Sequence, residues 1–101
     1  MMTRVYDLGH SRAGDKGDTS NISVIAFSDE AWPVIRDRLT VEKVREAFGS
    51  IVKGRITRYE LPKLRALNFV MEGALAGGVT RSLAMDAHGK SLSTLMSTIE
   101  I

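Results

Sequence analysis

The chain has 101 residues, 44% of them apolar, 26% charged and none cysteine, which is typical of a globular domain without disulfides, so we expect residues 1–101 to form one domain. No apolar run approaches the roughly 18 residues of a membrane span and no signal-peptide pattern is present, so we expect a cytoplasmic chain without a membrane partner. The net charge of +2 is small, and basic and acidic residues are interleaved, which argues against a nucleic-acid partner.

Two dissimilar stretches open the chain. Residues 3–8 are rich in β-formers and predict a short strand. The stretch 9–21 is the most unusual in the sequence, because three glycines, four charged side chains and a histidine fall within thirteen residues. Glycine admits sharp turns, so we predict that 9–21 is a loop whose N–H groups point at a common centre.

The next region predicts a strand and then helical structure. Residues 21–27 place apolar side chains at both parities towards their end, as in a central strand covered on both faces. Residues 28–30 have the short oxygen-bearing side chains and carboxylates of a helix start, and Thr40 offers a second N-cap. Apolar residues recur at helical spacing until Gly49, so we predict one bent helix or two short helices over 29–48.

The second half of the chain predicts further strands and a closing helix. Residues 55–61 and 67–71 are strand-like, and Pro62 ends the first of them. A second glycine-rich connection at 73–78 leads to a short predicted strand at 79–85 and a turn at 86–90. The spacing of apolar residues over 92–99 predicts an amphipathic helix. This order indicates an α+β two-layer sandwich, with helices on one face of a mainly antiparallel sheet.

The sequence resembles a known family, the small ferredoxin-like domain at the C-terminus of AtuA-type acyclic terpene utilisation proteins. The segments that carry the resemblance lie at 10–18, 21, 59–62, 67–69, 73–75, 77–83, 86 and 89–90. The resemblance implies a ferredoxin-like fold without an iron–sulfur cluster, in agreement with the absence of cysteine. It also implies a link to the catabolism of acyclic terpenes and other branched acyl-CoA compounds, and a separate large AtuA-like subunit as partner.

The stretch 9–21 is the first candidate binding site, because its cations and glycine N–H groups suit an anion and its carboxylates can orient a ligand. The candidate ligand-binding residues there are Arg12, Gly14, Asp15, Lys16, Gly17, Asp18 and Asn21. The alternative is a tight turn whose aspartates cap local N–H groups and whose cations are solvated. The stretch is not a Walker loop, because Lys16-Gly17 is followed by Asp18 instead of Ser or Thr.

The second glycine-rich segment is a candidate for the other half of the same site. Gly77 and Gly78 would let the backbone approach a ligand, Arg81 would clamp a carboxylate or phosphate, and Asn68 would add a polar group from the neighbouring strand. The alternative is a glycine-permitted bend with Arg81 paired to a surface acid. We predict that the segments around residues 14 and 78 meet.

Two functions are open at this point. The first is an accessory small subunit that binds an acyl-CoA or a carboxylate and assembles as a homo-oligomer, a dimer or higher, or with a large AtuA-like subunit. The alternative is an enzyme acting on acyl-CoA thioesters, a hydratase, isomerase or hydrolase, with His10 or Asp15 as the base. We expect no cofactor and no metal site, since the histidines are far apart and Asp15 and Asp18 are the only close carboxylates.

Overall fold

The computed structural model describes residues 3–16, 19–73 and 90–101. In chain order its elements are the helix α1 (Val5–Leu8), the strands β1 (Gly9–Lys16) and β2 (Thr19–Ala26), the helices α2 (Ala31–Arg38) and α3 (Val41–Phe48), the 3-10 turn η1 (Gly49–Ile51), the strand β3 (Ile56–Leu61), the 3-10 turn η2 (Pro62–Leu64), the strand β4 (Ala66–Met71) and the helix α4 (Lys90–Ser97). No helix among these is long and apolar enough to cross a membrane.

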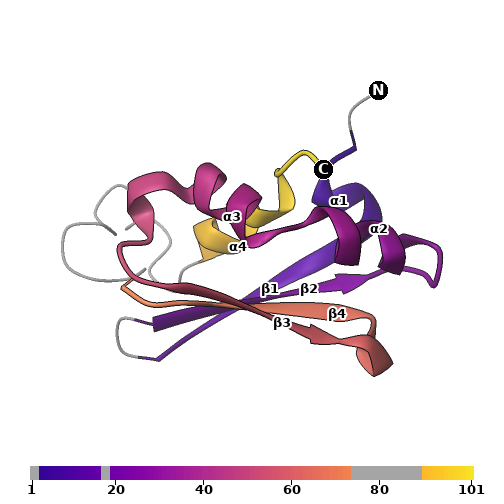
Figure 1. The fold of residues 1–101 in the computed structure, drawn as a ribbon, viewed down its shortest axis with the longest axis horizontal. Coiled ribbons are helices and arrows are strands. Elements are labelled where there is room, and N and C mark those ends of the chain that lie inside the picture. The colour runs from indigo at the N-terminus through magenta and orange to yellow at the C-terminus, as the bar shows by residue number, and fades with distance from the viewer. Residues whose placement is uncertain (1–2, 17–18, 74–89) are drawn as a thin grey trace.

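The strands form one antiparallel sheet in the order β1-β2-β4-β3. The helices all lie on one side of this sheet, and the described chain leaves the other side without a covering element (Figure 1). The expected α+β sandwich with helices on one face of an antiparallel sheet is therefore confirmed. β1 and β3 are the edges of the described sheet.

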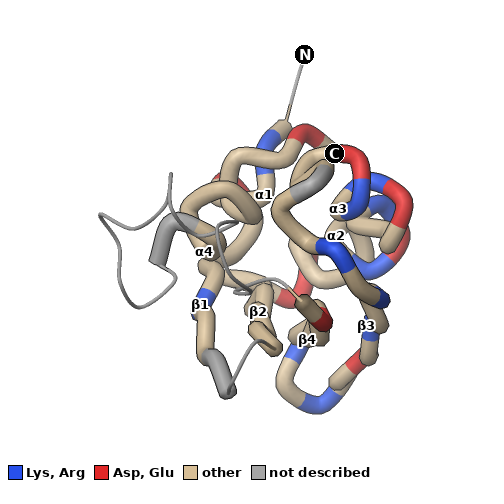
Figure 2. The backbone as a smooth tube through the Cα atoms, turned by 90° about the vertical axis from the view of Figure 1, so that its left-hand side faces the viewer, with Lys and Arg blue, Asp and Glu red and all other residues tan. Residues whose placement is uncertain are grey.

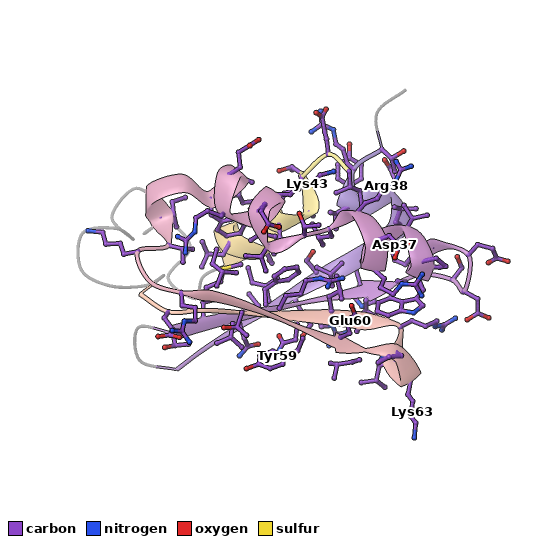
Figure 3. All side chains as sticks on the ribbon, in the orientation of Figure 1. Asp37, Arg38, Lys43, Tyr59, Glu60 and Lys63 are labelled. Carbon is purple, nitrogen blue, oxygen red and sulfur yellow. The ribbon has the colours of Figure 1, made fainter. Side chains whose placement is uncertain are left out.

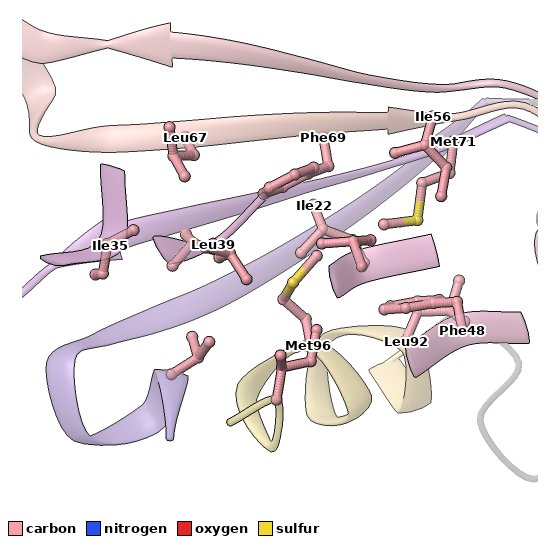
Figure 4. Packing of buried hydrophobic residues seen from close by; sticks show 14 of the residues in the cluster. Ile22, Ile35, Leu39, Phe48, Ile56, Leu67, Phe69, Met71, Leu92 and Met96 are labelled. Atoms are coloured by element: carbon pink, nitrogen blue, oxygen red, sulfur yellow. The ribbon is translucent and has the colours of Figure 1, made fainter. Parts of the chain in front are cut away.

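The core fills the space between the sheet and the helix layer. Alternate residues of β2 are buried, and so are Leu67, Phe69 and Met71 of β4, because successive side chains of a strand point to opposite faces. Figure 4 shows this packing, in which Phe69 and Ile22 of the sheet face Leu39, Met96 and other helix residues. All four of these side chains are inaccessible to solvent.

Side-chain caps explain why the helical region divides in two. The Ser28 hydroxyl accepts the Ala31 N–H at 3.1 Å, and the Thr40 hydroxyl accepts the Lys43 N–H at 3.2 Å. Each cap satisfies an amide that the first turn of a helix leaves unpaired. α3 then ends at Gly49, whose φ of 54° favours glycine. Helical structure over 29–48 is confirmed, and of the two predicted alternatives, one bent helix or two short helices, the structure has the second.

The opening strand predicted over 3–8 is wrong, because residues 5–8 form the single turn of α1. The Asp7 carboxylate accepts the Arg4 N–H at 3.0 Å and stabilises this turn. Val5 is fully buried, and its N–H donates to the Ile99 carbonyl at 2.9 Å. Tertiary contacts with the end of the chain thus outweigh the local β preference of this segment.

The loop predicted over 9–21 is also wrong, since most of it is the β1–β2 hairpin. β1 pairs with β2 from Gly9 opposite Ala26 to Lys16 opposite Thr19. Gly9 is needed for close approach: a Cβ there would lie 2.4 Å from the Ile25 carbonyl oxygen. Gly9 therefore fits a strand whose backbone lies close to that of β2, and composition alone did not distinguish this from a loop.

Of the remaining predictions of strands and helices, some are confirmed, one is partly wrong and some lie outside the described residues. Residues 55–61 and 67–71 are confirmed as β3 and β4, and the closing helix is confirmed as α4, two residues earlier than expected at each end. β2 is an inner strand as predicted, but the described part of the chain covers only one of its faces, and Asn21 on the other face is exposed. The predictions for 74–89 lie outside the described residues.

Candidate functional site

The side of the sheet away from the helices, which we call the open face, is built by strand register. Register places one residue of each strand in a row across this face, because paired residues of antiparallel strands point to the same side. The central row is Arg12, Ser23, Asn68 and Tyr59. The two flanking rows are His10, Ile25, Ala66 and Leu61, and Gly14, Asn21, Val70 and Thr57. Figure 3 shows Tyr59 projecting from this face, and Glu60 on the helix side.

Several of the residues predicted to bind a ligand share the open face. Arg12 and Gly14 lie there on β1, Asn21 lies opposite Gly14 on β2, and Asn68 lies in the row of Arg12. The Ser23 hydroxyl, between Arg12 and Asn68, donates to the Asn68 side-chain oxygen at 3.4 Å. Residues that the sequence places in two separate segments are therefore neighbours on one surface.

The other predicted site residues are placed only in part or not at all. The backbones of Asp15 and Lys16 belong to β1 and pair with Ser20 and Thr19. Gly17, Asp18, Gly77, Gly78 and Arg81 lie outside the described residues. The meeting of the segments around 14 and 78 therefore stays a prediction.

Arg12 is a cation on this surface, and it is exposed. It makes no hydrogen bond or ion pair with the described part of the chain. In contrast, Arg4, Arg36, Arg58 and Arg65 each pair with a carboxylate. β2 and β4 carry no charged residue, as the tan colour of these strands in Figure 2 shows, so the inner strands beside Arg12 are neutral. Such a group is available to an anion without breaking an existing contact.

Large apolar side chains gather at the opposite edge of the open face, around the end of β3. Tyr59 is 52% exposed, Leu61 39% and Leu64 65%. Leu61 and Leu64, with residues 60, 62 and 63, line an open hollow of about 570 Å³. We call Tyr59, Leu61 and Leu64 the apolar corner. Exposed apolar groups that cluster in this way mark binding surfaces more often than isolated ones do.

His10 lies at the end of the open face, beside a second hollow. Its ring centroid is 5.8 Å from that of Phe27, with the rings tilted by 34°. Both residues line a groove of about 270 Å³ with Tyr6, Gly9, Ser11 and residues 93, 94 and 97 of α4. The Ser11 hydroxyl oxygen is buried without a hydrogen-bond partner. Within the residues placed by the structure, no carboxylate bonds to His10 to orient it as a general base.

Two ionisable groups with shifted pKa values, those of Arg36 and Asp37, lie on the helix layer and away from the open face. Arg36 donates to the Asp37 carboxylate at 2.9 Å on α2. This hydrogen bond lowers the pKa of Asp37 below its ordinary value and raises that of Arg36. Both side chains are well exposed and lie away from the open face, so the pair is a surface ion pair. No three His, Asp or Glu side chains gather as a metal site in the ranges described.

Sequence reasoning missed two members of the central row, Ser23 and Tyr59. Each was predicted to lie on a strand, but the row depends on which residues the strands pair. The alternation of exposed and buried positions in β2 was the available signal, because it assigns Ser23 to the side opposite the core. Register across three strand pairs cannot be read from alternation alone.

Comparison with known proteins adds the family. A family model described as the AtuA ferredoxin-like domain matches residues 3–101. The match confirms the resemblance found in the sequence. No curated protein and no solved structure matches the chain.

Proposed function

This chain belongs to the family of AtuA ferredoxin-like domains, and from that premise we propose that it is an accessory binding subunit of an AtuA-type protein. The proposed ligand is an acyl-CoA or a branched carboxylate from acyclic terpene or related catabolism. The proposed large partner is an AtuA-like subunit. The observation that carries the proposal is the gathering of Arg12, Gly14, Asn21 and Asn68 on one uncovered face.

The polar half of the open face suits an anionic group. Arg12 offers a fork of N–H donors to a carboxylate or phosphate. Asn21 and Ser23 lie on the adjacent strand and can add hydrogen bonds to the same group. Because β2 and β4 carry no acid, no neighbouring negative charge on the inner strands opposes the anion.

The other half suits hydrocarbon. The apolar corner begins three strands away from Arg12, which at the usual spacing is about 14 Å across the sheet. Val70 and Ile25 lie on the inner strands between the two edges and are partly exposed. A ligand with an anionic head and an acyl chain would bind with its head at Arg12 and its chain towards Tyr59 and Leu61.

A titration tests this proposal. The chain is titrated by calorimetry with a branched acyl-CoA, with free CoA and with the corresponding free acid, for the wild type and for Arg12→Ala. Loss of a charge-assisted hydrogen bond should weaken binding by about 10- to 100-fold. Arg38→Ala, an exposed arginine on α2, is the matched control and should bind as the wild type does. Equal affinities for the wild type and Arg12→Ala, or no binding of any of the three compounds, would contradict the proposal.

The alternative function, an enzyme acting on acyl-CoA thioesters, has one observation in its favour. His10 lines a groove together with Ser11, whose buried hydroxyl has no partner. A base at this place would act on a thioester bound along β1. Turnover of acyl-CoA that disappears in His10→Gln and Asp15→Asn, with binding retained, would support this alternative over the accessory one.

A further inference from the structure

We infer that a second copy of this chain covers the open face, in a symmetric dimer whose two-fold axis runs along the strands between β2 and β4. The inference goes beyond the proposed ligand and partner, and because the dimer occupies the face proposed for the ligand, a second copy and the ligand would compete for it. Two edge strands bound this face, and the register of the four strands places three complete rows of residues on it.

With the two-fold axis along the strands, each row of one copy lies against the same row of the other copy, which runs across the sheet in the opposite direction. The β1 residue of a row then lies against the β3 residue of the partner's same row, and the β2 residue lies against the β4 residue. In the central row, Arg12 meets the partner's Tyr59, and Ser23 meets the partner's Asn68. Each of these contacts occurs twice in the dimer, since the interface is isologous.

These pairings are chemically complementary. A guanidinium over an exposed tyrosine ring forms a cation–π contact, and Tyr59 is 52% exposed in the single chain. A serine hydroxyl and an asparagine amide can each donate and accept. In one flanking row, Gly14 meets the partner's Thr57, so that a larger side chain lies against a smaller one.

The charge of Arg12 selects between the two symmetric arrangements of aligned sheets. An axis running across the strands at the central row would bring Arg12 against the partner's Arg12. Like charges in contact at a partly desolvated interface disfavour that arrangement. The axis along the strands instead separates the two guanidinium groups to opposite edges of the interface and gives each an aromatic partner.

The size of the face predicts a weak dimer. Four strands at the usual spacing, six residues long, present about 20 Å by 20 Å, or about 400 Å² on each copy. The total of about 800 Å² is below the range of stable complexes, and it is typical of transient ones. The apolar corner adds to it at the rim. The dimer should therefore dissociate at micromolar concentration.

Cross-linking tests the axis directly, because the chain has no cysteine of its own. His10→Cys and Leu61→Cys lie in one flanking row, both exposed, and leave the central row intact. The two variants, one carrying a mass tag, are mixed at about 200 µM and treated with a short bismaleimide that spans the ~10 Å between packed sheets. The mixed 10–61 product should dominate, and each variant alone should give little product.

Sedimentation tests the contact. The wild type should change from monomer to dimer between about 1 and 300 µM, and Tyr59→Ala should weaken the dimer by about 5- to 30-fold. Arg38→Ala should match the wild type. A monomer at every concentration, or 10–10 and 61–61 products equal to the mixed one, overturns the inference. Acyl-CoA binding is measured separately at a chain concentration below 1 µM, where the protein is monomeric. Failure of the dimer can therefore be distinguished from failure of the proposed ligand site.

Discussion

Replacing Gly9 by alanine should destabilise the fold sharply, whereas the same change at Gly14, on the same strand, should not. A Cβ at position 9 would lie 2.4 Å from the Ile25 carbonyl oxygen and 2.9 Å from its carbon, both backbone atoms of β2. Neither atom can move away by rotating a side chain. β1 must therefore separate from β2 by about 1 Å at this point to restore an ordinary contact distance of about 3.4 Å.

The magnitude follows from two opposing effects. Overpacking of this kind costs about 1–3 kcal/mol, and removing a glycine from the unfolded chain returns about 0.5–1 kcal/mol. Gly9→Ala should then lower the free energy of unfolding by about 1 kcal/mol at the middle of both ranges, and by up to about 2.5 kcal/mol. At Gly14, the added Cβ would lie 3.5 Å from the Asn21 side chain, an ordinary contact, so Gly14→Ala should be neutral or stabilising by up to about 1 kcal/mol.

Urea denaturation followed by circular dichroism measures both variants, and thermal melting should separate them by about 4–16 °C. A difference of less than about 0.5 kcal/mol between the two, the usual scatter of surface substitutions, would refute the reasoning. The denaturant slope should stay unchanged, because neither variant alters the surface exposed on unfolding. A changed slope would mean that the hairpin is remodelled instead of strained.

Three further predictions concern the helix layer. Thr40→Ala removes the hydroxyl that accepts the Lys43 N–H and should cost about 1 kcal/mol in denaturant unfolding, which Thr40→Ser restores. Arg58→Met removes a guanidinium that donates to the Arg36 carbonyl near the end of α2, and should cost about 1–3 kcal/mol by the same measurement. The pKa of Asp37 is lowered in the fold by the hydrogen bond from Arg36, so its contribution is present above the ordinary carboxyl pKa and lost as the pH falls through the lowered value. Asp37→Asn should therefore be slightly less stable at neutral pH and equal to the wild type in acid, and high salt should remove the difference.

Much of the fold was predictable because its signals are local. Thr40 has the composition and position of an N-cap, and Gly49 ends α3 with the positive φ for which glycine is suited. The periodicity that predicted α4 is confirmed by Leu92 and Met96, which are fully buried in the core. These signals depend on residues a few positions apart, and they do not require knowledge of the rest of the chain.

The errors arise where contacts are distant in sequence. α1 forms because Val5 is bonded to Ile99 and buried beneath the end of the chain, which no local pattern reveals. β1 forms because β2 supplies an apolar neighbour whose backbone Gly9 can approach. The candidate site shows the same division: residue types suggested Arg12 and Asn68, and only register showed that Ser23 lies between them.

The described ends of the chain are tied to each other on the side of the molecule away from the open face (Figure 1). The Ile101 N–H donates to the Thr3 carbonyl at 2.8 Å, and Arg4 pairs with Glu100. A surface anchor or a fused reporter attached beyond either end would therefore leave the sheet unobstructed. Immobilising the chain by one end should preserve access for a ligand or for a second copy, while tension between the two ends would break these terminal contacts before those of the hairpin.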